Sequence, residues 1–278
     1  MERVNILTMP SFVNAGGRSV YIIKDASKKY ELDWSKTDED LNVLFGFFSE
    51  DQPFDLLEFN SSSSAKVTYV IGANTKLNYA LAEINKSVSA SRTFVVDINA
   101  EFSGGLAHFA KGDSKLDMTF NLVGTGAKAL WRLATITKDN EKKSFNVSFN
   151  HESKNTYSKM ENYGVALNNS SLVFAGVSHI KKGASSSSAH QVAKITLFNE
   201  KSIGKANPIL RIDENEVSAS HGATVGRVNE EHLFYLTSRG ISKEGAIKIL
   251  TLGYLNPILK VFETSEVGKH IEQLIGAV

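Results

Sequence analysis

Alternation of apolar and polar residues is the feature that most constrains the fold of this 278-residue chain. In an extended chain successive side chains point to opposite faces, so an alternating run gathers its apolar side chains on one face of a strand. Four runs between residues 54 and 218 show the pattern, with apolar residues at Leu77, Tyr79 and Leu81, at Phe94, Val96 and Ile98, at Leu116, Met118, Phe120 and Leu122, and at Phe145, Val147 and Phe149. Turn-forming clusters occur at 60–64, 103–105, 124–126, 138–140, 168–170 and 183–186. Many short strands without helical periodicity predict an all-β body over residues 54–218.

A sandwich, a barrel and a β-solenoid all contain strands of this kind, and three features favour the solenoid. Residues 54–218 exceed the ~100 residues of a single sandwich. No proline occurs between Pro53 and Pro208, so hydrogen-bonded ladders can run without interruption. Asparagine and serine crowd the strand ends, where stacked coils place repeated turns. The sequence has no clear constant repeat length, so periodicity alone does not decide between the three architectures.

The segments on either side of this body differ from it. Residues 1–53 combine a short apolar run at 19–23 with an apolar cluster at 44–48, and they predict a separate, mixed N-terminal segment of strands with one short helix. After Pro208 helical patterns appear, and we predict helices over 230–238, over 243–252, and from Pro257 toward Ile275. The predicted organisation is therefore an N-terminal segment (1–53), a β core (54–218) and a helical C-terminal domain (219–278).

Residues at the predicted helix ends support the first two helices. Asn229 is a suitable N-cap for the helix over 230–238, and Gly240 stops that helix. Ser242 caps the second helix, which we expect to end at Gly253.

Charge and cysteine content exclude several classes of function. The chain has 31 basic and 30 acidic residues, so neither nucleic acid nor an anionic membrane is indicated as a partner. It contains no cysteine, which excludes disulfides, thiolate metal sites and cysteine nucleophiles. The first residues lack a leader-like apolar core, and no stretch approaches the ~20 apolar residues of a transmembrane helix, so we expect a cytoplasmic protein.

The common signatures of phosphate, metal and serine chemistry are missing from the sequence. No Gly-x-x-x-x-Gly-Lys-Ser/Thr loop occurs, so the chain is not itself a P-loop ATPase. Residues 124–129 imitate a dinucleotide-binding loop, but they lead into 130–137, which has the pattern of a strand instead of the phosphate-holding helix. The seven histidines form no His-x-x-x-His pair and no Gly-x-Ser-x-Gly occurs, so neither a preformed zinc site nor a serine hydrolase is indicated.

One segment, residues 218–224, surrounds a single imidazole with small residues. Ser220 and Gly222 flank His221 and let another backbone or subunit approach closely. A histidine at the end of a β body can exchange a proton or bind a metal. The residues alone leave two interpretations open: a functional histidine at an interface, and a packed junction whose histidine bonds only backbone.

A series of short segments near the C-terminus carries a family resemblance. They are residues 180–184, 189–191 and 195–198, then 208–212, 216–217, 220–226, 233–236 and 238–241. In order and in kind they resemble the C-terminal signature of the SufB/SufD family, the scaffold components of the SUF iron–sulfur cluster assembly machinery. The resemblance covers about 176–255 and is most specific in its second half, whereas 54–175 are similar only in style. It implies a right-handed parallel β-helix followed by a small helical domain.

The same resemblance implies a non-catalytic scaffold subunit with protein partners. Family members form a SufB–SufD pair on two copies of SufC, an ABC-type ATPase, so the missing P-loop is expected. SufC docking on residues 228–256 is implied, and the residues expected to contact it are Phe234, Tyr235, Leu236, Arg239 and Ile249. The resemblance implies no stably bound cofactor but a transient iron–sulfur cluster at the SufB-type interface, and it leaves a homodimer as a state of the isolated chain.

The absence of cysteine favours the SufD-like branch of the family. A SufB-type scaffold needs a thiolate to receive sulfur, because only the deprotonated sulfur is a competent nucleophile and soft ligand. SufB-type chains tend to carry Glu-His-Glu around the equivalent histidine, whereas this chain has Ser220-His221-Gly222, with Ala219 where some relatives have cysteine. The resemblance therefore assigns these three residues to a cluster-assembly interface and makes His221 a candidate metal ligand.

Two alternative functions are weighed against this one. A β-helical carbohydrate-binding or carbohydrate-active protein would need carboxylates and stacked aromatic residues along one solenoid face, which the sequence does not obviously supply. A SufB-like homodimeric scaffold acting alone is disfavoured because the chain has no cysteine.

Overall fold

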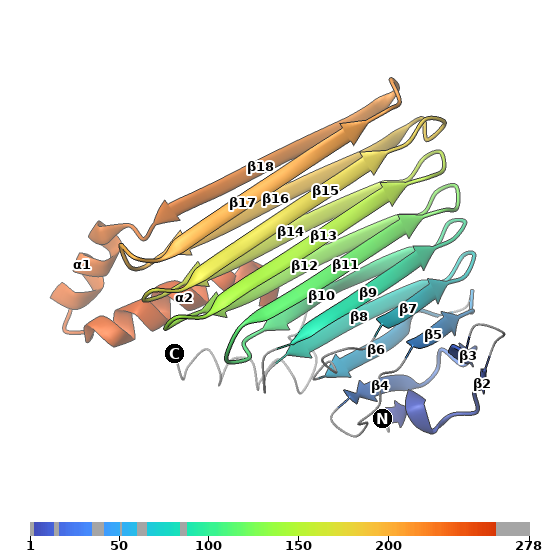
Figure 1. Cartoon of the computed structure of the whole chain (residues 1–278), viewed down its shortest axis with the longest axis horizontal. Helices are drawn as coiled ribbons and strands as arrows, with labels where there is room; N and C mark the ends of the chain where they lie inside the picture. Colours follow the sequence, from blue (N-terminus) through green and yellow to red (C-terminus); the bar gives the residue numbers. More distant parts are fainter. Residues whose placement is uncertain are drawn as a thin grey trace.

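The computed structural model describes residues 3–13, 17–34, 42–50, 52–59, 66–83 and 88–259, and these form two facing β-sheets followed by two helices (Figure 1). The first sheet, called the β18 sheet here, contains β1 (Arg3–Asn5), β4 (Lys29–Asp33), β6 (Phe54–Phe59), β8 (Lys76–Glu83), β10 (Glu101–His108), β12 (Lys128–Thr137), β14 (Tyr157–Ala166), β16 (Ser187–Leu197) and β18 (Val217–Arg227) in that order. The β17 sheet runs from β2 (Phe12–Val13) through β3 (Ser19–Ile23), β5 (Asn42–Phe47), β7 (Lys66–Ile71), β9 (Ser89–Val96), β11 (Ser114–Leu122), β13 (Lys142–His151) and β15 (Ser171–Ile180) to β17 (Ile203–Ile212). The other elements are a short 3-10 helix, η1 (Ile6–Thr8), and the helices α1 (Glu230–Ser238) and α2 (Lys243–Leu259).

Strand pairing identifies the body as a parallel β-solenoid. From β3 onward the chain alternates between the two sheets, and from β5 onward each strand pairs in parallel with the strand two places earlier in the chain. The antiparallel pair β2–β3 is the exception among the described strands. Sandwiches are built from antiparallel sheets, so this topology confirms the predicted solenoid over the sandwich.

The repeat lengthens along the chain, which explains why no constant period is visible in the sequence. In an early coil, Asp55 pairs in register with Asn78, and in a late coil Lys159 pairs with His190, a clearly larger separation along the chain. The strands also become longer along the chain, from 5 residues in β4 to 11 in β18. A sequence search for a fixed repeat fails because later coils add residues to their strands and turns.

The space between the two sheets, called the lumen here, holds the core. Of the alternating residues predicted to share a face, all but Ile98 are buried. Ile98 is exposed because β9 ends at Val96 and the next residues enter a turn. Aromatic rings stack from coil to coil along the lumen, with ring centres 4.7 Å apart between Phe94 and Phe120 and 4.6 Å apart between Phe120 and Phe149. The same position in successive coils therefore supplies one continuous hydrophobic stack.

Asparagine side chains build the turns at the strand ends. Asn74 and Asn99 adopt left-handed backbone conformations, with φ of 58° and 50°, which asparagine tolerates better than most residues. The Asn99 amide donates a hydrogen bond to Asn74 Oδ1 in the neighbouring coil (3.3 Å), and Asn168 donates in the same way to Asp139 Oδ1 (3.0 Å). These ladders link one turn to the next along the solenoid.

One predicted turn is wrong. Residues 103–105 lie inside β10, because Gly104 and Gly105 lie where neighbouring strands come close. A Cβ at Gly104 would lie 2.7 Å from the Tyr79 carbonyl oxygen, and one at Gly105 would lie 2.8 Å from that of Arg132. The clusters at 124–126, 138–140, 168–170 and 183–186 are turns as predicted, residues 130–137 lie in strand β12 as predicted, and the cluster at 60–64 lies outside the described residues.

Strand pairing continues across the two domain boundaries predicted from the sequence. β4 and β5, from the predicted N-terminal segment, pair in parallel with β6 and β7. At the other end, β18 runs through residue 218 and pairs with β16 along its full length. The same two sheets therefore continue across both predicted boundaries.

Helix α1 forms over the predicted residues, whereas α2 corrects the prediction. Asn229 accepts a hydrogen bond from the Glu231 N–H (2.8 Å), and Ser242 Oγ caps α2 by accepting one from the Gly245 N–H (3.1 Å). α2 does not end at Gly253 and no separate helix begins at Pro257, because both lie inside it.

Burial explains why α2 tolerates a glycine and a proline. The two residues cost roughly 1 and 3 kcal/mol in a helix interior. Leu255 and Ile258 from the same turns are buried against the outside of the β18 sheet, and burial of each contributes about 1.5–3 kcal/mol. The predicted continuation of this helix beyond residue 259 lies outside the described residues.

In the part of the chain that the structure describes, no helix is both long enough and apolar enough to cross a membrane.

A buried histidine in β13 makes the stability of the fold depend on pH. His151 Nδ1 and Nε2 lie 2.7 and 2.8 Å from the hydroxyls of Thr156 and Ser158. Burial lowers the pKa of His151 from 6.5 to about 4. The folded protein therefore holds the imidazole neutral while the unfolded chain protonates it below about pH 6.5, so this contribution to stability is complete above pH 6.5 and is lost as the pH falls toward 4.

We expect the free energy of unfolding to fall by about 2 kcal/mol between pH 7 and pH 5 through this one group. Urea unfolding at both pH values measures the loss, and His151→Gln, which does not titrate, should show a shallower pH dependence. Equal pH dependence of the wild-type protein and the variant would contradict the assignment.

Candidate functional site

The last turn of the solenoid, β17 and β18, is called the terminal coil here, and its side chains are largely exposed. In the described sheets β18 and β17 are the edge strands at this end (Figure 1). Earlier strands alternate buried and half-buried residues, but β17 alternates exposed and half-buried residues, and nine of the eleven residues of β18 are exposed. Four large apolar side chains on these strands are also exposed, namely Ile203, Ile209, Ile212 and Val225. A long, exposed and partly apolar edge of this kind is a template for pairing with another chain.

The backbone of the terminal coil offers hydrogen-bonding groups at this edge. The Val228 N–H donates to Leu197 O at the end of β16. Because successive N–H groups of a strand alternate in direction, those of His221, Ala223 and Val225 point away from β16. Pro208 in β17 follows the same rule: the Ile203 N–H donates toward β15, so the missing N–H of Pro208 is one that would face outward.

His221 lies on the lumen side of this open coil. It pairs in register with Gln191 of β16, whose side chain is buried in the lumen, and Gln191 pairs in register with Met160 of β14. His221 is exposed because no further coil covers it among the described residues. Within the described chain its imidazole has no hydrogen-bond or ion-pair partner, so both ring nitrogens are available to groups from outside.

The neighbours of His221 point to the other face or carry no side chain. Ser220 lies on the outer face, where its hydroxyl is 2.8 Å from His190 Nδ1. A Cβ built at Gly222 would also lie on the outer face and would meet no atom within 4 Å, so the outer face next to His221 is open there. The three predicted interface residues therefore differ in orientation: His221 points to the lumen, Ser220 contacts His190 on the outer face, and Gly222 carries no side chain.

No preformed metal centre is present among the described residues. Nowhere in the described ranges do three His, Asp or Glu side chains gather closely enough to hold a metal ion. A metal bound at His221 would need its other ligands from a second molecule.

The predicted docking residues lie on the two helices. Phe234 and Tyr235 of α1 are 74% and 57% exposed, and Ile249 of α2 is 47% exposed, whereas Leu236 is half-buried. The Arg239 guanidinium lies 5.3 Å from the centre of the Tyr235 ring. α1 and α2 therefore present exposed apolar surface at Phe234, Tyr235 and Ile249.

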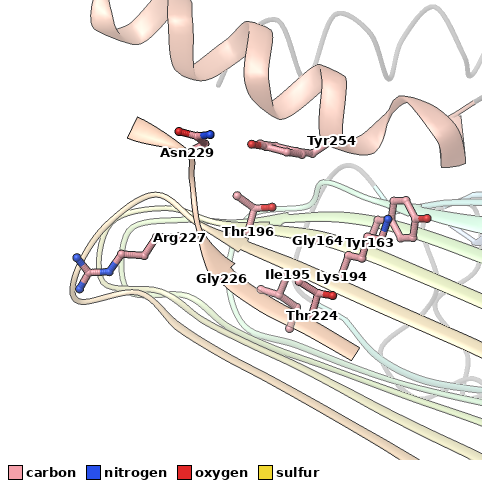
Figure 2. Close-up of a pocket in the computed structure, with 10 residues that line it drawn as sticks. All are labelled: Tyr163, Gly164, Lys194, Ile195, Thr196, Thr224, Gly226, Arg227, Asn229 and Tyr254. Carbon is pink, nitrogen blue, oxygen red and sulfur yellow. The ribbon is translucent and has the colours of Figure 1, made fainter. Parts of the chain in front are cut away.

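A pocket of about 400 Å³ separates α2 from the last strands of the β18 sheet (Figure 2). Tyr254 reaches down from α2, and Lys194 lies on the sheet with its Nζ 5.2 Å from the centre of the Tyr163 ring. Figure 2 shows Arg227 pointing away from the pocket. Its guanidinium forms an ion pair with Glu200 (3.2 Å). α2 lies against the middle coils through β12 and β14, whereas β18 remains paired to Arg227 and the buried Val228 leads directly to the N-cap of α1.

Sequence reasoning did not single out the residues of this pocket or the relation between Gln191 and His221. Lys194, Tyr163 and Tyr254 are far apart in the chain, and only strand register and the docking of α2 bring them together. An estimate of coil length would have aligned Gln191 with His221, since neighbouring coils in this part of the chain have nearly the same length.

Comparison with known proteins gives a family match. Residues 41–254 match the family described as SUF system FeS cluster assembly, SufBD core domain. The iron–sulfur cluster assembly protein SufD of Bacillus subtilis is 34% identical over 164 residues, which cover 59% of this chain and 38% of that protein. SufBD family iron–sulfur cluster assembly proteins of Staphylococcus aureus strain USA300 and Staphylococcus epidermidis are each 27% identical over 150 residues, or 53% of this chain and 32% of theirs.

The alignments thus span only about a third of the length of these relatives. The family match over residues 41–254 includes most of the solenoid, the terminal coil, α1 and most of α2. Taken with the fold and with the residues around His221, the match shows that the chain belongs to the SufB/SufD family of the SUF iron–sulfur cluster assembly system and is similar to SufD.

Proposed function

We propose that the protein is a SufD-type, non-catalytic scaffold subunit that pairs with a SufB-type chain through its terminal coil. The observation that carries the proposal is the exposed His221 on an uncovered lumen edge, with no partner of its own among the described residues. In this arrangement His221 contributes one imidazole at the seam between two subunits. The assembly acts in the cytoplasm.

Sulfur chemistry falls on the partner in this proposal. The chain has no cysteine, so it cannot carry a persulfide or supply a thiolate ligand to iron. An iron–sulfur cluster is the cargo of the assembly and lies only transiently at the seam, where a neutral imidazole can ligate iron alongside the partner's thiolates.

Edge pairing is the physical basis for the subunit contact. β17 and β18 supply outward-facing backbone groups together with the apolar side chains of Ile209, Ile212 and Val225. Two such edges from different chains can continue both sheets across the seam and exclude water from the lumen. The isolated protein, lacking the SufB-type chain, uses the same edge to pair with a second copy of itself.

The loss of His221 tests the proposed role directly. The assay uses a complex reconstituted with a SufB-type chain, SufC, a cysteine desulfurase, iron and ATP. In this complex His221→Ala should lower the cluster yield at least about tenfold, because mutating even an outer-shell partner of a metal ligand typically lowers metal affinity or activity ~10–100-fold. Cluster absorbance measures the yield, and circular dichroism and SufC binding should not change.

His190→Ala is the matched control, because His190 lies one strand away on the outer face. It should leave the cluster yield at the wild-type level. A wild-type yield from His221→Ala, or an equal loss from both variants, would contradict the role of His221.

The helices are proposed to bind the SufC ATPase, which would carry out ATP hydrolysis for the assembly. Phe234→Asp places a charge at the most exposed apolar side chain of α1. It should weaken SufC binding at least about tenfold, as expected for an aromatic side chain that becomes buried in the interface with the partner. His232→Asp adds the same group on another face of the helix and should bind normally. Titration calorimetry with both variants measures the difference, and equal affinities would argue against this docking surface.

A further inference from the structure

Two buried carboxamide oxygens, in the two coils that precede the terminal coil, have no hydrogen-bond donor. Asn162 Oδ1 and Gln191 Oε1 belong to residues that are 1% and 3% exposed. Both residues face the lumen, on β14 and β16. Buried acceptors of this kind are normally satisfied by protein or by ordered water.

The orientation of the Gln191 amide is fixed by its neighbours. Its Nε2 donates hydrogen bonds to Ser178 Oγ (2.7 Å) and to the Ile209 carbonyl oxygen (3.1 Å). Exchanging the amide oxygen and nitrogen would place two acceptors, Gln191 Oε1 and Ile209 O, against each other. Gln191 Oε1 is therefore an acceptor whose required donor is missing.

A small cavity lies at these two residues. It has a volume of about 10 Å³, and its lining includes Met160, Asn162, Gly176 and Gln191. Gly176 keeps it open, since a Cβ there would lie 2.8 Å from Gln191 Oε1 and 3.0 Å from Met160 Sδ. The missing side chain at Gly176 thus leaves space beside an unsatisfied oxygen.

We propose that this cavity binds one water molecule, which donates one hydrogen bond to Asn162 Oδ1 and one to Gln191 Oε1. The volume matches the roughly 10–15 Å³ that a single water needs, and two acceptors match its two O–H groups. An anion would be repelled by the two oxygens, and an apolar molecule would leave both of them unsatisfied. The site lies one coil below His221, so the water holds in place the Gln191 side chain that neighbours His221 in register.

Water relaxation dispersion on the full chain tests the site. The wild-type protein should show a long-lived internal water that is lost in Gly176→Ala, whose methyl group fills the cavity. Gly204→Ala is the matched control: its Cβ would also be crowded in the lumen, 2.9 Å from side-chain carbons of Ile195 and Val225, but it contacts no polar atom of this cavity. It should retain the water, and equal signals from wild type and Gly176→Ala would overturn the proposal.

A high-resolution crystal structure of the wild-type chain decides the matter even if Gly176→Ala does not fold. It should show one density peak at hydrogen-bond distance, about 2.7–3.2 Å, from both oxygens. An empty cavity, or a peak at the roughly 2.3–2.5 Å of an oxygen-ligated cation, would overturn the assignment of water.

Discussion

Replacing Arg92 with leucine is expected to lower the free energy of unfolding by about 3–5 kcal/mol, among the largest losses available to a single substitution in this chain. Arg92 and Glu58 are both fully buried in the lumen, where Arg92 Nε and Nη2 donate to Glu58 Oε1 at 2.8 and 2.6 Å. Three neutral donors surround the same carboxylate, from Trp34, Tyr69 and Tyr79. Without Arg92 the carboxylate would remain buried without its counter-charge.

The surroundings of Glu58 explain why the effect should be large. Burial, followed by the Glu58 charge, raises the pKa values of Tyr69 and Tyr79 well above 10, so both remain neutral hydrogen-bond donors. They can share the charge of Glu58 but cannot neutralise it. The cost of one uncompensated charge is therefore concentrated in the early coils of the solenoid.

Urea unfolding measures the loss, and Arg132→Leu is the matched control. Arg132 forms an ion pair with Glu161 at 3.2 Å, but both side chains are partly exposed, so its loss should cost no more than about 1 kcal/mol. The double variant Glu58→Leu/Arg92→Leu should recover much of the stability lost in Arg92→Leu. Equal losses from Arg92→Leu and Arg132→Leu would show that burial of the pair does not govern its contribution.

Replacing Ala223 with proline is expected to abolish pairing with a SufB-type chain while leaving the fold intact. The N–H of Ala223 points away from β16, so the substitution removes a donor from the outer edge without breaking the ladder to β16. Pro208 already occupies an outward-facing position of this kind in β17, so an edge strand of this protein tolerates proline.

Co-purification with the SufB-type chain measures the pairing, and melting temperature and circular dichroism report the fold. Ala223→Ser keeps the N–H and should pair normally. Co-purification of Ala223→Pro at the wild-type level would contradict pairing through the edge of β18.

Local patterns in the sequence predict much of the fold. Alternation assigns Leu116, Met118 and Phe120 to the lumen because the two faces of a strand differ in burial, and Asn229 predicts the start of α1 because its side chain satisfies a free N–H. The failures have long-range causes. Gly104 resembles a turn residue, but it lies inside a strand where the close approach of Tyr79 leaves no room for a side chain. Pro257 resembles a helix start, but the burial of Leu255 and Ile258 stabilises α2 on both sides of it.

The site is predicted only in part for the same reason. The sequence marks His221 through its small neighbours and its family resemblance, but the side to which the imidazole points depends on its register with Gln191. The buried pair of Glu58 and Arg92 gives no local signal either, since the two residues are 34 positions apart. Strand register brings residues that are distant in the chain into contact. Because coil length increases along the chain, a fixed repeat length does not predict that register.

Photo-cross-linking from the terminal coil tests the proposed seam most directly. Because the chain has no cysteine, Ser218→Cys gives a unique attachment point on β18 for a benzophenone maleimide, and Thr119→Cys on β11 gives a matched point in the middle of the other sheet. In a complex with a SufB-type chain and SufC, the label at residue 218 should cross-link to the SufB-type chain and the label at residue 119 should not. Cross-linking of the SufB-type chain from residue 119 but not from residue 218 would contradict the account.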